Sequence, residues 1–240
     1  VKYVIPIGLT LMGFLAAGFI WKKRGTSPKC TGFEFFDEMT ADGIPDGYSV
    51  MIIGRAGSGK SMLCQQLMHN YLTQGKKCVY VTYDSFPDEV RKNMKNFHWV
   101  TSKYERNEDF KFVDCYSQIA GVTSREEYHT EQPFSLSELS ILISAAMGEG
   151  EGRARSTRVF LDSTAPLFTR LDPAQVINFM QDRGARIKGC EGIFFFTVGE
   201  GTVPARLMRR LDEIVDCIVE LDVNEEKGKT LSKMRIKKLR

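Results

Sequence analysis

The stretch "YSVMIIGRAGSGKSMLCQQL", Tyr48 to Leu67, decides the fold of this chain. It opens with a near-continuous apolar run, as in a parallel strand that is buried on both faces. A glycine-rich turn comes next, and the apolar residues beyond it recur at helical spacing. The turn, Gly54 to Ser61, matches the pattern G-x-x-x-x-G-K-[ST] between a strand and a helix, which is the context that this motif requires. The sequence therefore predicts a phosphate-binding loop in an α/β domain.

The residue types of this loop fit a bound nucleotide. Glycines let the backbone wrap closely round phosphates, and the helix N-terminus adds positive potential. We expect Lys60 to reach the β and γ phosphates and the Ser61 hydroxyl to coordinate Mg²⁺. The residues expected to contact the nucleotide are Gly54, Arg55, Ala56, Gly57, Ser58, Gly59, Lys60, Ser61 and Met62.

Such a site needs a second carboxylate at the end of a neighbouring strand to hold the water shell of the metal. Asp162, which closes the apolar stretch "VFLD", fits this role. The next residue is Ser163 rather than Glu, so a water-activating acid must come from elsewhere in the chain.

The rest of the chain alternates predicted strands and helices. We expect a single doubly wound α/β domain with a mostly parallel sheet flanked by helices and some antiparallel strands late in the chain. Capping signals mark two helices: "SLSE", Ser135 to Glu138, opens one that runs to about Met147, and Asp172 opens another that ends before Gly189. Further strands are expected at 78–83, 110–115, 158–162, 193–198, 216–221 and 230–236.

The N-terminal stretch "VIPIGLTLMGFLAAGFIW", Val4 to Trp21, contains no charge and precedes the cations "KKR". It is just long enough to span a bilayer, and the cations predict a cytoplasmic location for the domain beyond them. A cleaved signal peptide and a buried core helix are less suitable alternatives. We therefore expect a single-pass protein of the cell membrane, with an anchor at 1–24, a linker at 25–30 and the α/β domain with a basic tail at 31–240.

Charge and cysteine content exclude several classes of function. The net charge is +3, but seven cations and no acid lie from Lys227 to Arg240, and without these seven the chain carries −4. This distribution argues against a broad nucleic-acid-binding face. The six cysteines form no C-x-x-C pair, which favours buried free thiols over disulfides or a metal site.

From Cys30 to Arg235 the chain resembles the RecA superfamily and, within it, the KaiC-like ATPases. The resemblance rests on "GFEFFDEMTADGIPDGYSVMIIGRAGSGKS", "VYVTYDSFPDEVRKNMKNF", "RVFLDS" and "LSKMR". It implies a RecA-like core that binds ATP and Mg²⁺ at subunit interfaces, commonly in hexameric rings. In the family an acid of a Glu-Glu pair positions the attacking water, and here the pair falls on Asp84 and Ser85. We expect slow hydrolysis with Asp84 as the remaining acid, or ATP binding with little turnover, because a shorter carboxylate reaches less far.

The resemblance also implies that cations of the "KMR" stretch reach the γ-phosphate of a neighbouring subunit. Lys233 and Arg235 are the candidates here. The alternative is a solvated basic strand edge or attraction to anionic lipid. Ile236 stands where the family usually has Gly, so the chain departs from the family's pattern directly after Arg235.

Three functions are compatible with these features. The first is a membrane-anchored ATPase that acts as an oligomeric switch and signals to a partner protein. The second is an ATP sensor or scaffold with little hydrolysis, similar to accessory proteins of archaeal motility. The third is a DNA recombinase relative, which is disfavoured because only about fifteen residues, without a basic or Gly-rich DNA loop, separate "FFFTV" from the next strand.

Overall fold

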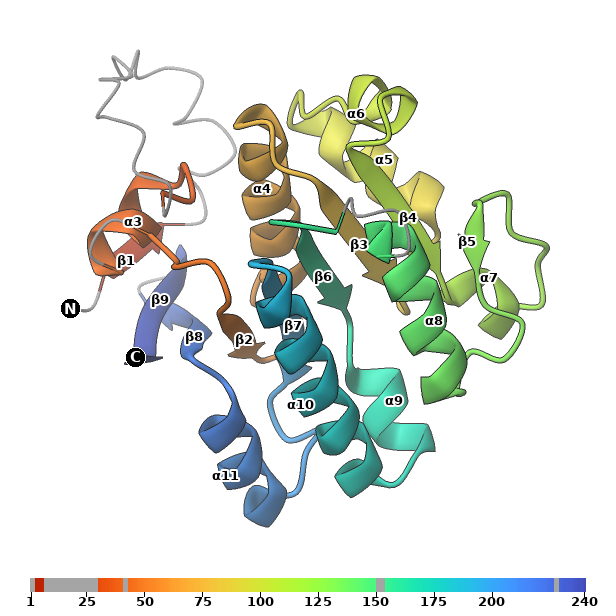
Figure 1. Cartoon of the computed structure of the whole chain (residues 1–240). Coiled ribbons are helices and arrows are strands. Elements are labelled where there is room, and N and C mark those ends of the chain that lie inside the picture. Colours follow the sequence, from red (N-terminus) through yellow and green to blue (C-terminus); the bar gives the residue numbers. More distant parts are fainter. Residues whose placement is uncertain (1–2, 7–29, 41–42, 150–153, 227–228) are drawn as a thin grey trace.

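The computed structural model describes residues 3–6, 30–40, 43–149, 154–226 and 229–240. Within these residues the strands form one sheet in the order β1-β9-β8-β2-β7-β6-β3-β4-β5 (Figure 1). The strands from β8 to β5 in this order are parallel, whereas β9 is antiparallel to both β8 and β1. The sheet thus agrees with the predicted mostly parallel α/β core and its late antiparallel strands. The strands are β1 (Tyr3–Pro6), β2 (Ser49–Gly54), β3 (Cys78–Thr82), β4 (Phe110–Asp114), β5 (Tyr128–His129), β6 (Arg158–Asp162), β7 (Ile193–Gly199), β8 (Cys217–Glu226) and β9 (Lys229–Leu239).

Helices cover both faces of the sheet (Figure 1). One face packs against α8 (Leu136–Met147), α9 (Ala165–Arg170), α10 (Pro173–Gly189) and α11 (Ala205–Ile214). The opposite face packs against α3 (Glu34–Met39), α4 (Lys60–Thr73), α5 (Pro87–Asn96) and α6 (Ser102–Arg106). A short helix, α7 (Tyr116–Ile119), comes after β4.

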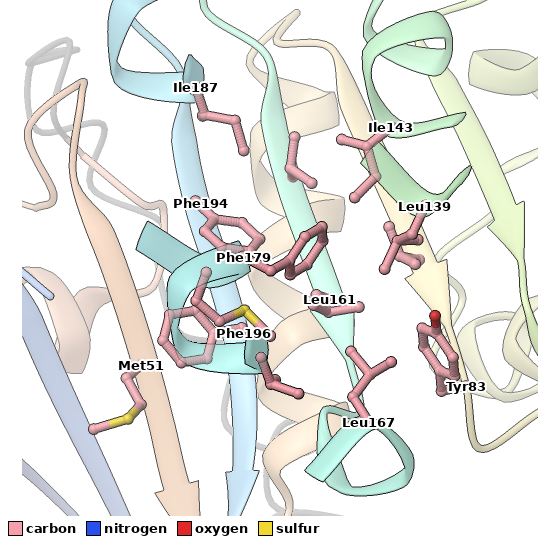
Figure 2. Packing of buried hydrophobic residues seen from close by; sticks show 14 of the residues in the cluster. Met51, Tyr83, Leu139, Ile143, Leu161, Leu167, Phe179, Ile187, Phe194 and Phe196 are labelled. Carbon is pink, nitrogen blue, oxygen red and sulfur yellow. The ribbon is translucent and has the colours of Figure 1, made fainter. Parts of the chain in front are cut away.

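Alternation along the central strands builds a separate apolar core on each face, because successive side chains of a strand point to opposite sides. In β7, Phe194 and Phe196 join the core under α8 to α11. Figure 2 shows both rings within this cluster. Phe195 joins the other core, where its ring stacks on that of Phe160 at 4.6 Å between centroids. The strands are therefore apolar throughout, which is why they could be recognised in the sequence.

The predicted helix starts are confirmed by their caps. The Ser135 hydroxyl accepts a hydrogen bond from Glu138 N at 3.3 Å, and the Asp172 carboxylate accepts one from Ala174 N at 2.7 Å. Gly189 is the last residue of α10 rather than the first residue beyond it.

The segment between β7 and β8 differs from the sequence analysis, which predicted no helix there. It contains α11, whose exposed face carries Arg206, Arg209 and Arg210. This segment therefore carries cations, but on a helix rather than on a basic or Gly-rich loop.

The prediction of a transmembrane helix before the domain was also wrong. Tyr3–Pro6, where the expected span begins, form β1, whose backbone pairs with β9 in an antiparallel ladder instead of forming helical hydrogen bonds. No helix within the described part of the chain has the length and apolar character needed to cross a bilayer. Residues 7–29, which include the rest of the expected span, lie outside the described residues. The single-pass location with a cytoplasmic domain depended on this helix and loses its support.

Candidate functional site

The phosphate loop connects β2 to α4 at the carboxyl end of the parallel strands. Gly57 and Gly59 have φ angles of 76° and 91°, in the left-handed region that favours glycine. A Cβ atom on Gly54 would lie 2.4 Å from the Leu221 carbonyl oxygen and 2.5 Å from Ser58 Oγ. Only glycine fits these positions, and the resulting curve brings the loop backbone to the start of α4. The first N–H groups of a helix have no intrahelical partner, so they can bind phosphate oxygens.

Lys60 is the first residue of α4. Its Nζ atom donates hydrogen bonds to the carbonyl oxygens of Gly54 at 2.9 Å and Arg55 at 2.7 Å. Burial lowers the pKa of the ammonium group, while the negative charges of Asp162 and Asp84 oppose this shift. The cation is therefore held on the loop within the electrostatic reach of both carboxylates.

Asp162 ends β6, two strands from the phosphate-loop strand. Its side chain is only 7% exposed. Oδ2 accepts a hydrogen bond of 2.6 Å from the Tyr80 hydroxyl, and Oδ1 accepts one of 2.8 Å from the Thr197 hydroxyl. These donors are neutral, and the described residues form no ion pair with Asp162. A carboxylate in this setting suits a nearby divalent cation, which prefers oxygen ligands.

Asp84 comes after β3, the strand that pairs with β6 so that Thr82 lies opposite Asp162. Its side chain is exposed, unlike that of Asp162. Desolvation by the surrounding protein nevertheless raises the pKa of Asp84, whereas a hydrogen bond from Ser163 lowers it. The register of β3 and β6 thus places Asp84 and Asp162 at the same edge of the sheet.

The structure adds Tyr80, Thr197 and Glu200 to the predicted site residues. Glu200 N donates to the Gly54 carbonyl at 3.0 Å, and its carboxylate pairs with Arg55 at 3.1 Å. Thr197 is the one hydroxyl residue in the apolar run "IFFFTV", and a buried Tyr needs a polar partner. These two features could be noticed in the sequence. That Tyr80 and Thr197 share Asp162 as a partner depends on the order of the strands, which the sequence does not show.

Lys233 and Arg235 do not lie beside Lys60, Asp84 and Asp162. They are on β9, two strands from β2 on the side away from β6 and β3. Arg235 forms an ion pair with Glu220 of the same chain, and Lys237 Nζ lies 3.5 Å from that carboxylate.

The end of the basic tail also binds within the chain. Lys238 Nζ donates to the Asp212 and Val215 carbonyls at 2.5 and 2.6 Å, and Arg240 donates to the Glu213 carbonyl at 2.7 Å. These cations therefore satisfy carbonyl groups at the end of α11.

Comparisons with known proteins agree with this geometry. A UPF0273 protein of Saccharolobus solfataricus is 31% identical over 210 residues, which cover 85% of this chain and 72% of the relative. A UPF0273 protein of Methanopyrus kandleri is 30% identical over 220 residues, which cover 88% and 82%. The flagellar accessory protein FlaH from Methanocaldococcus jannaschii shares the fold, with a TM-score of 0.65 at 16% identity over 85% of this chain and 84% of that chain.

The family model described as "ATPase: KaiC" matches residues 30–240. This range contains the phosphate loop, Asp84, Asp162 and both strands of the β8–β9 hairpin. The chain therefore belongs to the KaiC family of nucleotide-binding ATPases, within the RecA superfamily.

Proposed function

We propose that this chain binds ATP with Mg²⁺, hydrolyses it slowly and acts as a nucleotide-dependent switch made of several copies. The observation that carries the proposal is that the register of β3 and β6 sets Asp84 and Asp162 at the edge of the sheet where the phosphate loop holds Lys60. Charged groups of these types beside a phosphate loop suit phosphoryl transfer to water. The domain that performs it extends over 31–240.

The loop backbone, Lys60 and the residues that hold the metal have different roles in this proposal. The backbone of Gly54–Met62 binds the phosphates, and Lys60 leaves its carbonyl partners to neutralise the β and γ phosphates. Ser61 and Asp162 would hold Mg²⁺, the serine through its hydroxyl and the aspartate through its carboxylate. Bound Mg²⁺ supplies neutralisation of the charge that develops on the transferred phosphoryl group.

Asp84 orients the attacking water in this proposal. It is one methylene shorter than the Glu typical of the family, and a small misplacement of such a group costs about a hundredfold in rate. Ser85 has no carboxylate to replace the missing reach. Slow turnover is the consequence, with ATP resident in the site for longer than in relatives that carry the Glu pair.

Family membership supports association of several copies, and a hexameric ring is the arrangement that the resemblance implies. Lys233 and Arg235 lie away from the site of their own chain, which suits a role toward the site of a neighbouring copy. Arg235 would then exchange its ion pair with Glu220 for the γ-phosphate.

The test is ATP binding and phosphate release by the full chain and by its Lys60→Ala and Arg235→Ala variants. We expect Lys60→Ala to abolish binding, and Arg235→Ala to preserve binding while lowering phosphate release. Lys92→Ala on α5 and Arg155→Ala are matched controls, since both residues are exposed cations outside the phosphate loop and β9. Unchanged ATP binding by Lys60→Ala would refute the proposal.

The second candidate function, an ATP-binding scaffold without hydrolysis, is favoured by the Asp84-Ser85 sequence. It predicts tight Mg²⁺-dependent binding with no phosphate release by the wild-type chain at any protein concentration. A release rate that rises with protein concentration and falls in Arg235→Ala would exclude it.

A further inference from the structure

The geometry points to Tyr80 and Thr197 as positioning residues that lock the Asp162 carboxylate for the metal. This inference rests on the proposed MgATP binding and adds two side chains to it. Both hydroxyls bind the carboxylate from neighbouring strands, since β6 lies between β7 and β3.

Three adjacent strands place these groups on the same face of the sheet. Phe160 pairs with Tyr80 on one side and with Phe195 on the other, and all three belong to the core beneath α4. Asp162 and Thr197 each lie two residues further along their strands. Because side chains alternate with period two, they point toward the same face as the three aromatic rings. The carboxylate therefore lies beneath the helix that begins at the phosphate loop.

The hydroxyls are buried and reach both oxygens of the carboxylate. Tyr80 is 1% exposed and Thr197 is fully buried, while Asp162 retains 7% exposure. An ionised carboxylate can accept about four hydrogen bonds, so two fixed donors leave acceptor positions for water bound to a metal. With one donor on each oxygen, the plane of the carboxylate is also fixed.

A link from the phosphate-loop helix completes the arrangement. The buried Gln65 side chain of α4 lies beside the Tyr80 hydroxyl and opposes the rise in its pKa that burial causes. The tyrosine that holds the carboxylate therefore also neighbours the helix that begins at the phosphate loop. Outer partners of this kind typically contribute 10- to 100-fold to metal affinity or activity.

The test measures how much Mg²⁺ improves nucleotide binding. The affinity of the full chain for N-methylanthraniloyl-ATP is measured by fluorescence in EDTA and in excess Mg²⁺, and the ratio of the two dissociation constants is the Mg²⁺ gain. Tyr80→Phe and Thr197→Val each remove one hydroxyl at nearly constant volume. We expect each to reduce the gain by about tenfold or more while affinity in EDTA stays within about twofold of wild type.

Two matched controls remove buried hydroxyls that touch no carboxylate. The hydroxyl groups of Tyr71 and Thr157 have no hydrogen-bond partner among the described residues. Tyr71→Phe and Thr157→Val should therefore keep the wild-type Mg²⁺ gain. Thr197→Ser retains a hydroxyl and should restore most of the gain that Thr197→Val loses, and this pair decides the question if Tyr80→Phe does not fold.

The outcomes separate this inference from the function beneath it. A wild-type chain without a Mg²⁺ gain refutes the proposed MgATP binding and the inference with it. A normal gain in wild type that persists in Tyr80→Phe and Thr197→Val refutes only the inference. A lower Tm in these variants with an unchanged gain also refutes it, because the hydroxyls would then act only in folding.

Discussion

The two ends of β6 each bury a charge, and they handle it in opposite ways. Arg158 at the start is fully buried and pairs with Asp46 at 2.5 Å, with its guanidinium 5.1 Å from the centre of the Tyr71 ring. Asp162 at the end has only neutral hydroxyl donors among the described residues. A buried charge without an ionic partner is costly, which fits the proposed role of this end of β6 as the place for a cation. In the proposed function the first end serves the fold and the second serves the metal site.

The largest expected effect is on folding and concerns the first end. Asp46→Asn leaves the buried Arg158 guanidinium without its carboxylate and should lower the free energy of unfolding by about 2–3 kcal/mol. The value is below that of a fully buried pair because the Asp46 side chain is 35% exposed. Chemical denaturation measures it, and the Mg²⁺ gain should not change. Glu191→Gln, which removes an exposed ion pair with Arg155, should leave stability unchanged.

The second end should show the reverse pattern. Asp162→Asn keeps the size of the side chain but removes its charge, so we expect a loss of the Mg²⁺ gain of about 100-fold. Stability should change little, because a buried charge is removed and one of the two hydroxyl groups can turn to accept a hydrogen bond from the new amide NH₂. The two ends of β6 would not differ in role if Asp162→Asn destabilised the chain as much as Asp46→Asn and still bound MgATP normally.

Asp84 is a second carboxylate at the same edge of the sheet as Asp162, but its side chain is exposed. Asp84→Asn should lower phosphate release at least tenfold, because general-base positions contribute about 10²- to 10⁴-fold. The affinity for MgATP should stay within about threefold. Asp88→Asn, on the first turn of α5 and paired with Arg91, is the matched control. Equal phosphate release by Asp84→Asn and wild type would remove Asp84 from the mechanism.

The smallest effect is on stability without nucleotide. The pKa of Asp84 is raised above its ordinary value of 3.8, so the folded chain binds this proton more readily than the unfolded chain. Wild-type stability therefore falls as pH rises from 3.8 through the folded-state pKa. Asp84→Asn lacks this cost, and its Tm should exceed that of wild type near pH 7 by no more than about 2 °C. Thermal melts at several pH values should show this difference narrowing toward pH 3.8.

Local sequence patterns were sufficient to predict most of the fold and part of the site. The buried strands could be predicted because both of their faces are apolar. The phosphate loop could be predicted because its glycines, lysine and serine must follow one another at fixed spacing. The apolar stripe that packs α11 against the core, Leu207, Met208, Leu211 and Ile214, recurs at helical spacing and is the signal in the sequence for this helix. The first strand could not be predicted, because its partner β9 lies more than 220 residues away in the chain.

The residues around Asp162 show a second limit. Tyr80, Asp162 and Thr197 are far apart in sequence, and each looks like part of an ordinary strand. They meet only because β6 lies between β3 and β7, and no local pattern fixes this order. The partner of Arg158 could not be predicted for the same reason, since Asp46 belongs to a loop that is distant in sequence.

The most direct test of the proposed function is phosphate release at saturating MgATP by wild type and Asp84→Glu, beside Asp88→Glu as control. If the missing methylene causes slow turnover, Asp84→Glu should release phosphate about 10- to 100-fold faster with similar ATP affinity. Asp88→Glu should match wild type. Release by Asp84→Glu that is no faster than wild type, with MgATP still bound, would show that the length of this side chain does not limit turnover.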